Sequence, residues 1–248
     1  MTNTRLTDTE EYIWRYINQH FDHIAQLTIS ELSEAASVSN ASIIRTLKKK
    51  GFGGFTDFKH DIQLKRRDNL HVLSNHDLSE DTQRSIVKNY QEVIRTLNMI
   101  DVDTLEKSIP LIHQAEKIIL FARGFSELIA SEMLVKFQLV NKYCELHTDP
   151  NIIRPISKRL SERTFVIMIS LNGETKSLVD AAKNCVENQV PTLLISANQS
   201  SSLAKLAPLT LFGFKTDLSY FPDFEVHSRL PLFILSRILL DAYAASLR

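Results

Sequence analysis

The stretch Phe165-Val166-Ile167-Met168-Ile169-Ser170-Leu171-Asn172-Gly173-Glu174-Thr175-Lys176 decides the fold of the larger part of this chain. Its apolar first half is typical of a buried strand, and the residues after Thr175 have the spacing of a helix. The turn between them collects backbone N–H groups, short hydroxyls and a helix N-terminus in one place. That arrangement binds anions, most often phosphate. The sequence therefore predicts that the chain binds a phosphorylated small molecule.

Four further apolar segments alternate with helical patterns between residues 103 and 248. The five expected strands are Lys117–Phe121, Tyr143–His147, Phe165–Leu171, Thr192–Ser196 and Leu209–Phe212. Strands separated by helices predict parallel βαβ units, here a five-stranded flavodoxin-like α/β sheet flanked by helices. Ligands of such sheets bind beyond the carboxyl ends of the strands at the point where the strand order reverses. We expect Ser126 to cap the helix after the first strand and to face the same crevice as Ser170 and Thr175.

The first 76 residues have helical spacing throughout and predict an all-α domain. Thr7 and Glu10 have the spacing of a capping box that opens the first helix, and two shorter helices are expected at Phe21–Leu27 and Ile29–Ala36. After the break at residues 37–39, Asn40 is expected to cap a helix that stops at Gly51. Helix, tight turn and second helix form the helix-turn-helix plan. Residues 77–102 are expected to form a connector helix before the α/β domain of residues 103–248.

The second helix of this pair carries side chains suited to double-stranded DNA in a major groove. Short hydrogen-bonding groups stand at its start, a guanidinium follows, and lysines near its end suit the phosphate backbone. The expected DNA-binding residues are Ser39, Asn40, Ser42, Arg45, Lys48 and Lys49. Residues 40–67 carry eight basic and two acidic side chains, a net charge of +6 in a chain whose formal charge is zero. The alternative is that the lysines only complement the helix dipole.

Composition narrows the class of protein. The chain has 248 residues, 29 basic and 29 acidic side chains, and no apolar run long enough for a membrane span. Its polar, acidic N-terminus is unlike a secretory signal, so we expect a cytoplasmic protein without membrane contact. Cys144 and Cys185 are expected to be reduced thiols in the core. No metal and no cofactor are expected, because no second cluster of ligands accompanies His147, Asp149 and Asn151.

The segment TISELSEAASVSNASIIRTLKKKGFGGFTDFK resembles the N-terminal domain of the RpiR/MurR family of bacterial transcription regulators. The closing Gly51-Phe52-Gly53-Gly54-Phe55 with Phe58-Lys59 is its most specific part. The family's recognition helix has a Ser-x-x-Thr-x-x-Arg pattern, which Ser39, Ser42 and Arg45 match with Ser in place of Thr. Phe52, Phe55 and Phe58 are expected to pack in the core, not to stack on bases.

The segments FARGFSELIASEM, VIMISLNGETKSLVDAAKNC and LISANQSSSLAKLAPLTLFG resemble the SIS (sugar isomerase) domain that binds phosphosugars. Within this resemblance Ser126, Ser170, Asn172 and Thr175 fall where the family holds phosphate or sugar hydroxyls. The full set of expected sugar-phosphate-binding residues is Arg123, Gly124, Ser126, Ser170, Asn172, Gly173, Glu174, Thr175, Glu225 and His227. Ala122 and Asn172 depart from the family motifs, which usually have Gly and Ser there.

Four residues of that set have alternative interpretations. Arg123 either contacts phosphate or a carboxylate of the ligand, or forms a surface ion pair. Glu174 is expected to act on the helix dipole and not as a catalyst. Glu225 and His227 either perform acid/base chemistry or shape the pocket or a subunit contact, and the second interpretation is favoured.

Together these features predict a DNA-binding regulator of carbohydrate metabolism genes that is controlled by a phosphorylated sugar and has no catalytic residues. The alternative function is a sugar-phosphate isomerase or lyase with an accessory helical domain, and a third is a regulator that binds a protein partner. The helix-turn-helix with its basic segment favours the regulator. We expect a homodimer or homotetramer that forms through the SIS domain and buries parts of the last helix.

Overall fold

The computed structural model describes residues 6–19, 24, 27–59, 78–221 and 226–247, and it divides the chain into two compact units, Met1–Ser79 and Glu80–Arg248. The described part of unit 1 contains α1 (Asp8–Gln19), α3 (Ile29–Ala35) and α4 (Asn40–Lys49). Most of the helix expected at residues 21–27 lies outside the described residues. The unit 1 core comprises Ile13, Ile17, Ile24, Leu32, Ile43, Leu47 and Phe58.

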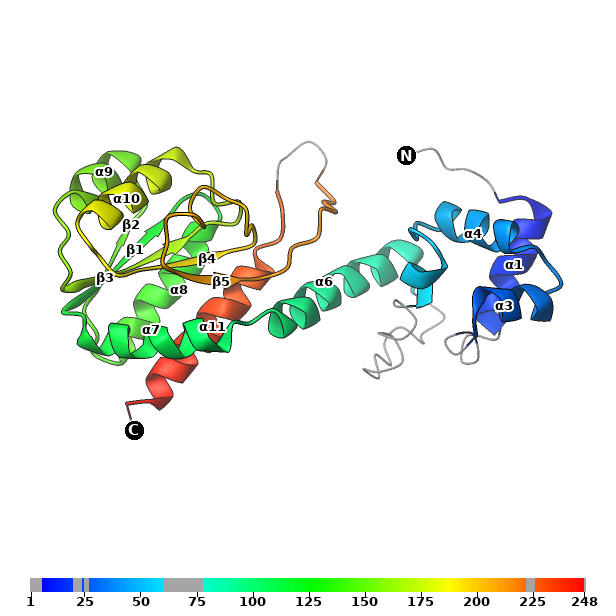
Figure 1. The fold of residues 1–248 in the computed structure, drawn as a ribbon, viewed down its shortest axis with the longest axis horizontal. Coiled ribbons are helices and arrows are strands. Elements are labelled where there is room, and N and C mark those ends of the chain that lie inside the picture. The colour runs from blue at the N-terminus through cyan, green and yellow to red at the C-terminus, as the bar shows by residue number, and fades with distance from the viewer. Residues whose placement is uncertain (1–5, 20–23, 25–26, 60–77, 222–225, 248) are drawn as a thin grey trace. The chain divides into compact units, whose positions relative to one another are not determined.

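Unit 2 is a three-layer α/β structure (Figure 1). Its elements are α6 (Glu80–Asn98), α7 (Val102–Gln114), β1 (Lys117–Ala122), α8 (Ser126–Leu139), β2 (Cys144–His147), α9 (Pro150–Ser157), β3 (Thr164–Ile169), α10 (Lys176–Glu187), β4 (Thr192–Ser196), β5 (Leu209–Phe212) and α11 (Leu230–Ala245). The five expected strands are confirmed. All four strand pairs are parallel and the order is β2-β1-β3-β4-β5. The order reverses between β1 and β3, as in other flavodoxin-like sheets.

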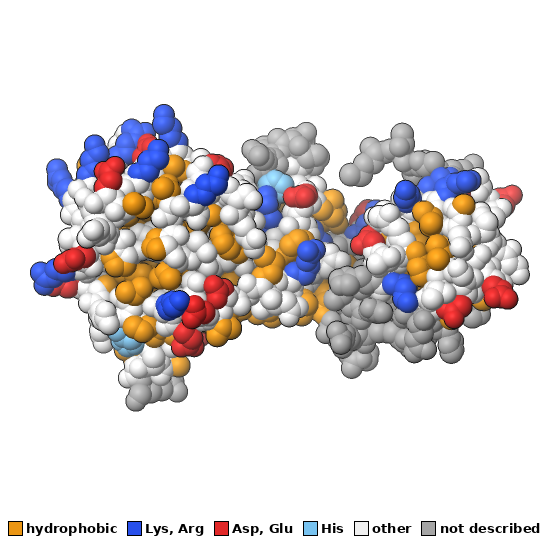
Figure 2. Space-filling view, in the orientation of Figure 1, with side chains coloured by type: hydrophobic (Ala, Val, Ile, Leu, Met, Phe, Trp, Pro, Cys, Tyr) orange, Lys and Arg blue, Asp and Glu red, His pale blue; other side chains and the backbone are white. Residues whose placement is uncertain are grey.

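Alternation along the strands divides the core into two layers. Ile118, Leu120 and Ala122 of β1 face α7, α8 and α11, whereas Ile119 and Phe121 face α9 and α10. Lys and Arg side chains gather over α9 and α10 on the outer surface (Figure 2). No helix in the described part of the chain combines the length and the apolar character that crossing a membrane requires.

Both cysteines are buried free thiols, as expected. Cys144 lies in β2 and Cys185 in α10. Burial raises the pKa of Cys144 to about 12 and that of Cys185 to about 11. Both thiols are therefore protonated and unreactive at neutral pH.

Helix α6 departs from its sequence pattern. Its apolar side chains at helical spacing are at most partly buried, and Leu97 is 43% exposed; they are Ile86, Val87, Tyr90, Val93, Ile94 and Leu97. The residues that it buries completely are Glu92 and Thr96. Glu92 and Thr96 are buried in place of the apolar side chains because they form hydrogen bonds with the segment that follows β5.

Candidate functional site

The helix-turn-helix of unit 1 is built by two helix ends of the same type. After α3, the Val38 amide donates to the Ser33 carbonyl (3.0 Å) and the Ser37 amide to the Glu34 carbonyl (3.1 Å). After α4, the amides of Phe52 and Gly51 do the same with the carbonyls of Leu47 and Lys48 (3.0 and 3.1 Å). This pairing is the Schellman motif, which requires a left-handed residue. Gly51 (φ 92°) supplies it after α4 and Ser37 (φ 54°) after α3.

The N-cap of α4 is Ser39 and not Asn40 as expected. The Ser39 hydroxyl accepts from the Ser42 amide (3.1 Å) and lies 2.9 Å from the Ser42 hydroxyl. Asn40 is instead the first helical residue and is exposed. Both serine hydroxyls are thus partly engaged within the helix end, and the side chain of Asn40 points outward.

The expected basic surface of α4 is divided by the structure. Arg45 and Lys48 are exposed and lie one turn apart. Lys49 instead forms a 2.7 Å ion pair with the buried Glu10 of α1, and Lys50 lies 4.9 Å from the centre of the Trp14 ring. Lys49 therefore holds α4 against α1. The sequence pattern instead predicts Lys49 on the DNA-binding surface beside Lys48. Lys65, Arg66 and Arg67 lie outside the described residues.

The phenylalanines after α4 pack in the core, which confirms the expectation. Phe58 is 1% exposed, and its ring lies 5.0 Å from that of Phe52 in an edge-to-face arrangement. Phe55 and Trp14 lie 6.4 and 6.3 Å from the Phe58 ring. These rings hold the end of α4 against α1.

The carboxyl ends of β1 and β3 are adjacent in unit 2, because Ala122 pairs with Ile169. Two turns therefore start side by side: Arg123–Phe125, here the β1 turn, and Ser170–Thr175, here the β3 turn. The end of β4 is next to β3, since Ile169 pairs with Ile195. The structure thus brings the β1 and β3 turns to the same edge of the sheet.

The β3 turn is held by a network of polar contacts. The Gly173 amide donates to the buried Ser170 hydroxyl (3.1 Å), and Gly173 has φ 68°. The Ser196 hydroxyl donates to the Leu171 carbonyl (3.2 Å), and the Asn198 side-chain amide donates to the Asn172 carbonyl (3.0 Å). The turn is therefore fixed before any ligand arrives.

Thr175 occupies the N-cap position of α10, but its hydroxyl makes no capping bond. The first turn of a helix leaves its amide groups without intrahelical partners, and these amides attract anions. A hydroxyl and the first amides of α10 thus stand together beside the β3 turn.

Glu174 has a different role from the expected one. It precedes the N-cap of α10, and its carboxylate accepts from the amide and the hydroxyl of Ser202 (2.8 and 2.7 Å). These hydrogen bonds lower the pKa of Glu174. Glu174 therefore anchors the segment after β4 to the β3 turn.

The β1 turn is less open to an anion than expected. The Gly124 amide donates to the Glu127 carboxylate (2.9 Å), and Gly124 has φ 57°. Arg123 donates to the Thr148 carbonyl after β2 and lies 3.8 Å from Glu127. Of its two interpretations, the structure shows the ion pair. Ser126 is buried but does not cap α8, because Phe125 holds the cap position and the helix starts at Ser126.

The remaining expected residues lie after β5. His227 is partly buried, its Nδ1 atom has no hydrogen-bond partner in the described part of the chain, and its carbonyl accepts from Arg229 (2.6 Å). Glu225 lies outside the described residues.

Lys215, which the sequence analysis missed, reaches the β3 turn. Its ammonium group donates to the side-chain oxygen of Asn172 (3.1 Å). The signal in the sequence was its position three residues beyond the end of β5, at the same edge of the sheet as the β3 turn. Lys215 brings a positive charge to this edge.

Comparisons with known proteins agree with this architecture. The model of the helix-turn-helix domain of the rpiR family matches residues 1–68, and that of the SIS domain matches residues 111–212. An uncharacterized HTH-type transcriptional regulator of Thermotoga maritima is 32% identical over 195 residues, which cover 76% of this chain and 70% of that protein. The HTH-type transcriptional regulator GlvR of Bacillus subtilis is 26% identical over 97% of this chain and 91% of its own length.

Among solved structures, the Vibrio vulnificus NanR protein complexed with ManNAc-6P is similar in fold. Its TM-score is 0.60 at 18% sequence identity, over 97% of this chain and 88% of that chain.

Proposed function

Because the chain belongs to the rpiR family of helix-turn-helix transcriptional regulators with a SIS domain, we propose that a phosphorylated sugar bound at the β3 turn controls its affinity for operator DNA. The observation that carries this proposal is the β3 turn itself. A fixed turn, the uncommitted hydroxyl of Thr175 and the N-terminus of α10 stand together at the switch point of the sheet. The similar NanR structure holds ManNAc-6P, a phosphorylated sugar.

We place the phosphate at the β3 turn and not at the β1 turn. The Gly124 amide is occupied by the Glu127 carboxylate, which repels a phosphate dianion. A carboxylate is, however, a good acceptor for sugar hydroxyls. The phosphate then lies near Ser170, Gly173 and Thr175, and the sugar ring extends toward Glu127.

For DNA binding we propose that α4 enters the major groove. Asn40 and Arg45 are the exposed side chains suited to base edges, and Lys48 is suited to a backbone phosphate. The hydroxyls of Ser39 and Ser42 already contact each other at the start of α4. We propose that their remaining lone pairs accept hydrogen bonds from the DNA. Lys49 is left out of this surface because it is paired with Glu10.

We propose that unit 2 senses the sugar phosphate without converting it. A sugar-phosphate isomerase needs a residue that moves a proton to and from the sugar. The carboxylate within the β3 turn, Glu174, accepts two hydrogen bonds from Ser202, and His227 lies on the segment after β5 and not on that turn. The T. maritima and B. subtilis relatives are named as regulators.

Self-association through unit 2 is proposed to use α8, in place of the expected last helix. Most apolar side chains of α11 already pack inside the unit, whereas α8 and its N-cap residue present an exposed stripe at coiled-coil spacing: Phe125, Leu128, Val135 and Leu139, exposed by 54, 61, 54 and 77%. Glu132 lies in the middle of this stripe and is bound by Arg237 at 2.9 and 3.2 Å. We expect Leu128→Glu with Val135→Glu to lower the molar mass measured by light scattering. An unchanged mass would exclude this surface.

The test of the sugar site is a thermal-shift titration with glucose 6-phosphate, fructose 6-phosphate and N-acetylmannosamine 6-phosphate, paired with operator gel shifts. We expect at least one sugar phosphate to stabilise the chain and to change its operator affinity. Ser170→Ala with Thr175→Ala should abolish the stabilisation and leave the DNA affinity of the free protein intact. Ser161→Ala is the matched control, because Ser161 is exposed and precedes β3 at the opposite edge of the sheet. Full stabilisation of the double variant would refute this placement.

A further inference from the structure

The segment Gly213–Thr216, here called the β5 strap, leaves the sheet and is hydrogen-bonded to α6. The Phe214 amide donates to the Thr96 hydroxyl (3.0 Å), and that hydroxyl in turn lies 3.5 Å from the Phe214 carbonyl. The amide and the hydroxyl of Thr216 both donate to one oxygen of Glu92 (3.1 and 2.8 Å). These contacts account for the complete burial of two polar side chains on α6.

The strap fits too closely to slide along α6. A Cβ atom on Gly213 would lie 2.6 Å from the Pro231 side chain and 3.1 Å from that of Thr96. The Gly213 amide donates to the Ser196 carbonyl at the end of β4 (2.9 Å). The Arg95 guanidinium lies 3.5 Å from the centre of the Phe214 ring. A displacement of the strap must therefore be shared with α6.

Glu92 is held as a buried anion. Burial alone would raise its pKa, but the nearby polar groups of Ser228, the hydrogen bonds from Thr216 and the charge of Lys88, 3.2 Å away, hold the pKa below its ordinary value. A buried carboxylate that loses its hydrogen-bond donors is left as an unpaired buried charge, which destabilises the fold. The contact between α6 and Thr216 is consequently one that the protein cannot give up without rearrangement.

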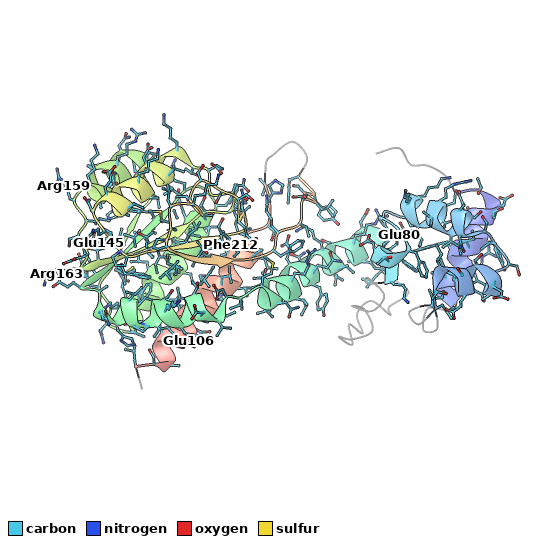
Figure 3. All side chains as sticks on the ribbon, viewed as in Figure 1. Glu80, Glu106, Glu145, Arg159, Arg163 and Phe212 are labelled. Carbon is cyan, nitrogen blue, oxygen red and sulfur yellow. The ribbon has the colours of Figure 1, made fainter. Side chains whose placement is uncertain are left out.

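Lys215 lies between the two anchored residues of the strap and reaches away from α6 to the β3 turn. Its contact with Asn172 joins the strap to the proposed ligand site, whereas Phe214 and Thr216 bind α6. Figure 3 marks Phe212, after which the strap begins, and Glu80, the first residue of α6. Glu80 directly follows Ser79, the last residue of unit 1.

We infer that the β5 strap transmits the state of the β3 turn to α6, and that Lys215 is the side chain that senses the ligand. This inference rests on the proposed function. A phosphate dianion at the β3 turn offers Lys215 a hydrogen bond in which both partners are charged, and this is stronger than its bond to the neutral Asn172 amide. When Lys215 exchanges one partner for the other, its neighbours Phe214 and Thr216 move with it. Because Phe214 and Thr216 are hydrogen-bonded to Thr96 and Glu92, α6 moves as well. Helix α6 is the element that directly follows the DNA-binding unit in the chain.

The first experiment compares Thr96→Val, which removes the strap's hydroxyl partner, with Thr96→Ser, which keeps it. Operator affinity of the full chain is measured with and without the sugar phosphates named above. Allosteric factors are typically about 5–150-fold. We expect Thr96→Val to bind the sugar phosphate within about threefold of the wild type but to lower the ligand's effect on operator affinity to about twofold or less. Thr96→Ser should restore that effect. A full ligand effect in Thr96→Val would overturn the inference.

The second experiment uses no ligand, so it remains decisive if the proposed sugar response itself is absent. Hydrogen exchange of the full chain is compared between the wild type, Lys215→Met and the control Lys183→Met, which alters an exposed lysine on α10. We expect Lys215→Met to speed exchange at the amides of Phe214 and Thr216 and around Glu92 in α6, by about threefold or more, and Lys183→Met to leave them unchanged. Faster exchange confined to the β3 turn would overturn the inference while leaving the proposed ligand site intact.

Discussion

Gly173→Ala should destabilise the β3 turn strongly. Gly173 has φ 68°, a left-handed conformation that costs a residue with a Cβ atom about 1–2 kcal/mol. The new methyl group would also lie 2.3 Å from the hydroxyl oxygen of Ser201 and 2.5 Å from its Cβ atom. Ser201 is fully buried, so it cannot simply swing away.

The expected cost is the sum of these two effects. Overpacking of a buried site typically costs about 1–3 kcal/mol, so the total is about 2–5 kcal/mol. For a unit of this size each kcal/mol lowers the melting temperature by about 2–4 °C. Calorimetry of the full chain should therefore show the transition of unit 2 lowered by about 4–20 °C. The fluorescence of Trp14, the single tryptophan, reports unit 1 separately.

Gly124→Ala is the matched control. Gly124 has φ 57°, but no atom lies within 4 Å of the position of its Cβ atom. It should bear only the backbone cost, about 1–2 kcal/mol. The combination of Gly173→Ala with Ser201→Gly should recover about 1–3 kcal/mol by removing the clash. Equal destabilisation by Gly173→Ala and Gly124→Ala would refute the reasoning, because the close approach of Ser201 would then contribute nothing.

Three further predictions concern unit 1. Ser37→Gly should raise the free energy of unfolding by about 0.5–1 kcal/mol in urea titrations, because relief of the left-handed strain exceeds the extra chain entropy of glycine. Gly51→Ala, at the equivalent position after α4, should lower the free energy of unfolding. A change of the same sign in both variants would contradict the assignment of a left-handed residue to both helix ends. The hydrogen bond from Lys49 holds the pKa of Glu10 at about 2, against an ordinary 4.5, so its contribution is complete above pH 4.5 and is lost as the pH falls toward 2. Glu10→Gln should therefore flatten the acid dependence of unit 1 stability followed by tryptophan fluorescence, and an unaltered profile would show that the pair does not stabilise the unit. For DNA, Lys48→Ala should reduce the slope of log affinity against log salt by about one, whereas Lys49→Ala should change that slope little, and a reversal of the two would place Lys49 on the DNA surface.

The sequence predicted the sheet well, because its three central strands, β1, β3 and β4, are short apolar runs that the fold buries on both faces. The β3 turn was also predictable, since a strand, a glycine and a helix follow one another without a break. The caps were predicted less well. Ser39 and Asn40 are both good N-cap residues, and only the backbone geometry selects Ser39.

Contacts between residues distant in the chain could not be predicted from local patterns. The Lys49 side chain has the same charge as that of Lys48, and only the position of Glu10 on α1 distinguishes them. Glu92 and Thr96 contradict the apolar pattern of α6, because they are bonded to strap residues about 120 positions later in the chain. Lys215 was missed for the same reason: the strap that presents it has no periodicity of its own.

The two outermost strands, β2 and β5, have only four residues each. A strand this short exposes few backbone groups at the border of the sheet, so it is a poor template for pairing with another chain. Two copies of the protein gain little by joining their sheets into one. The self-association proposed above would thereby be directed to helical surfaces. There side chains and not the backbone select the partner, and two copies could change their mutual angle without breaking a ladder of hydrogen bonds.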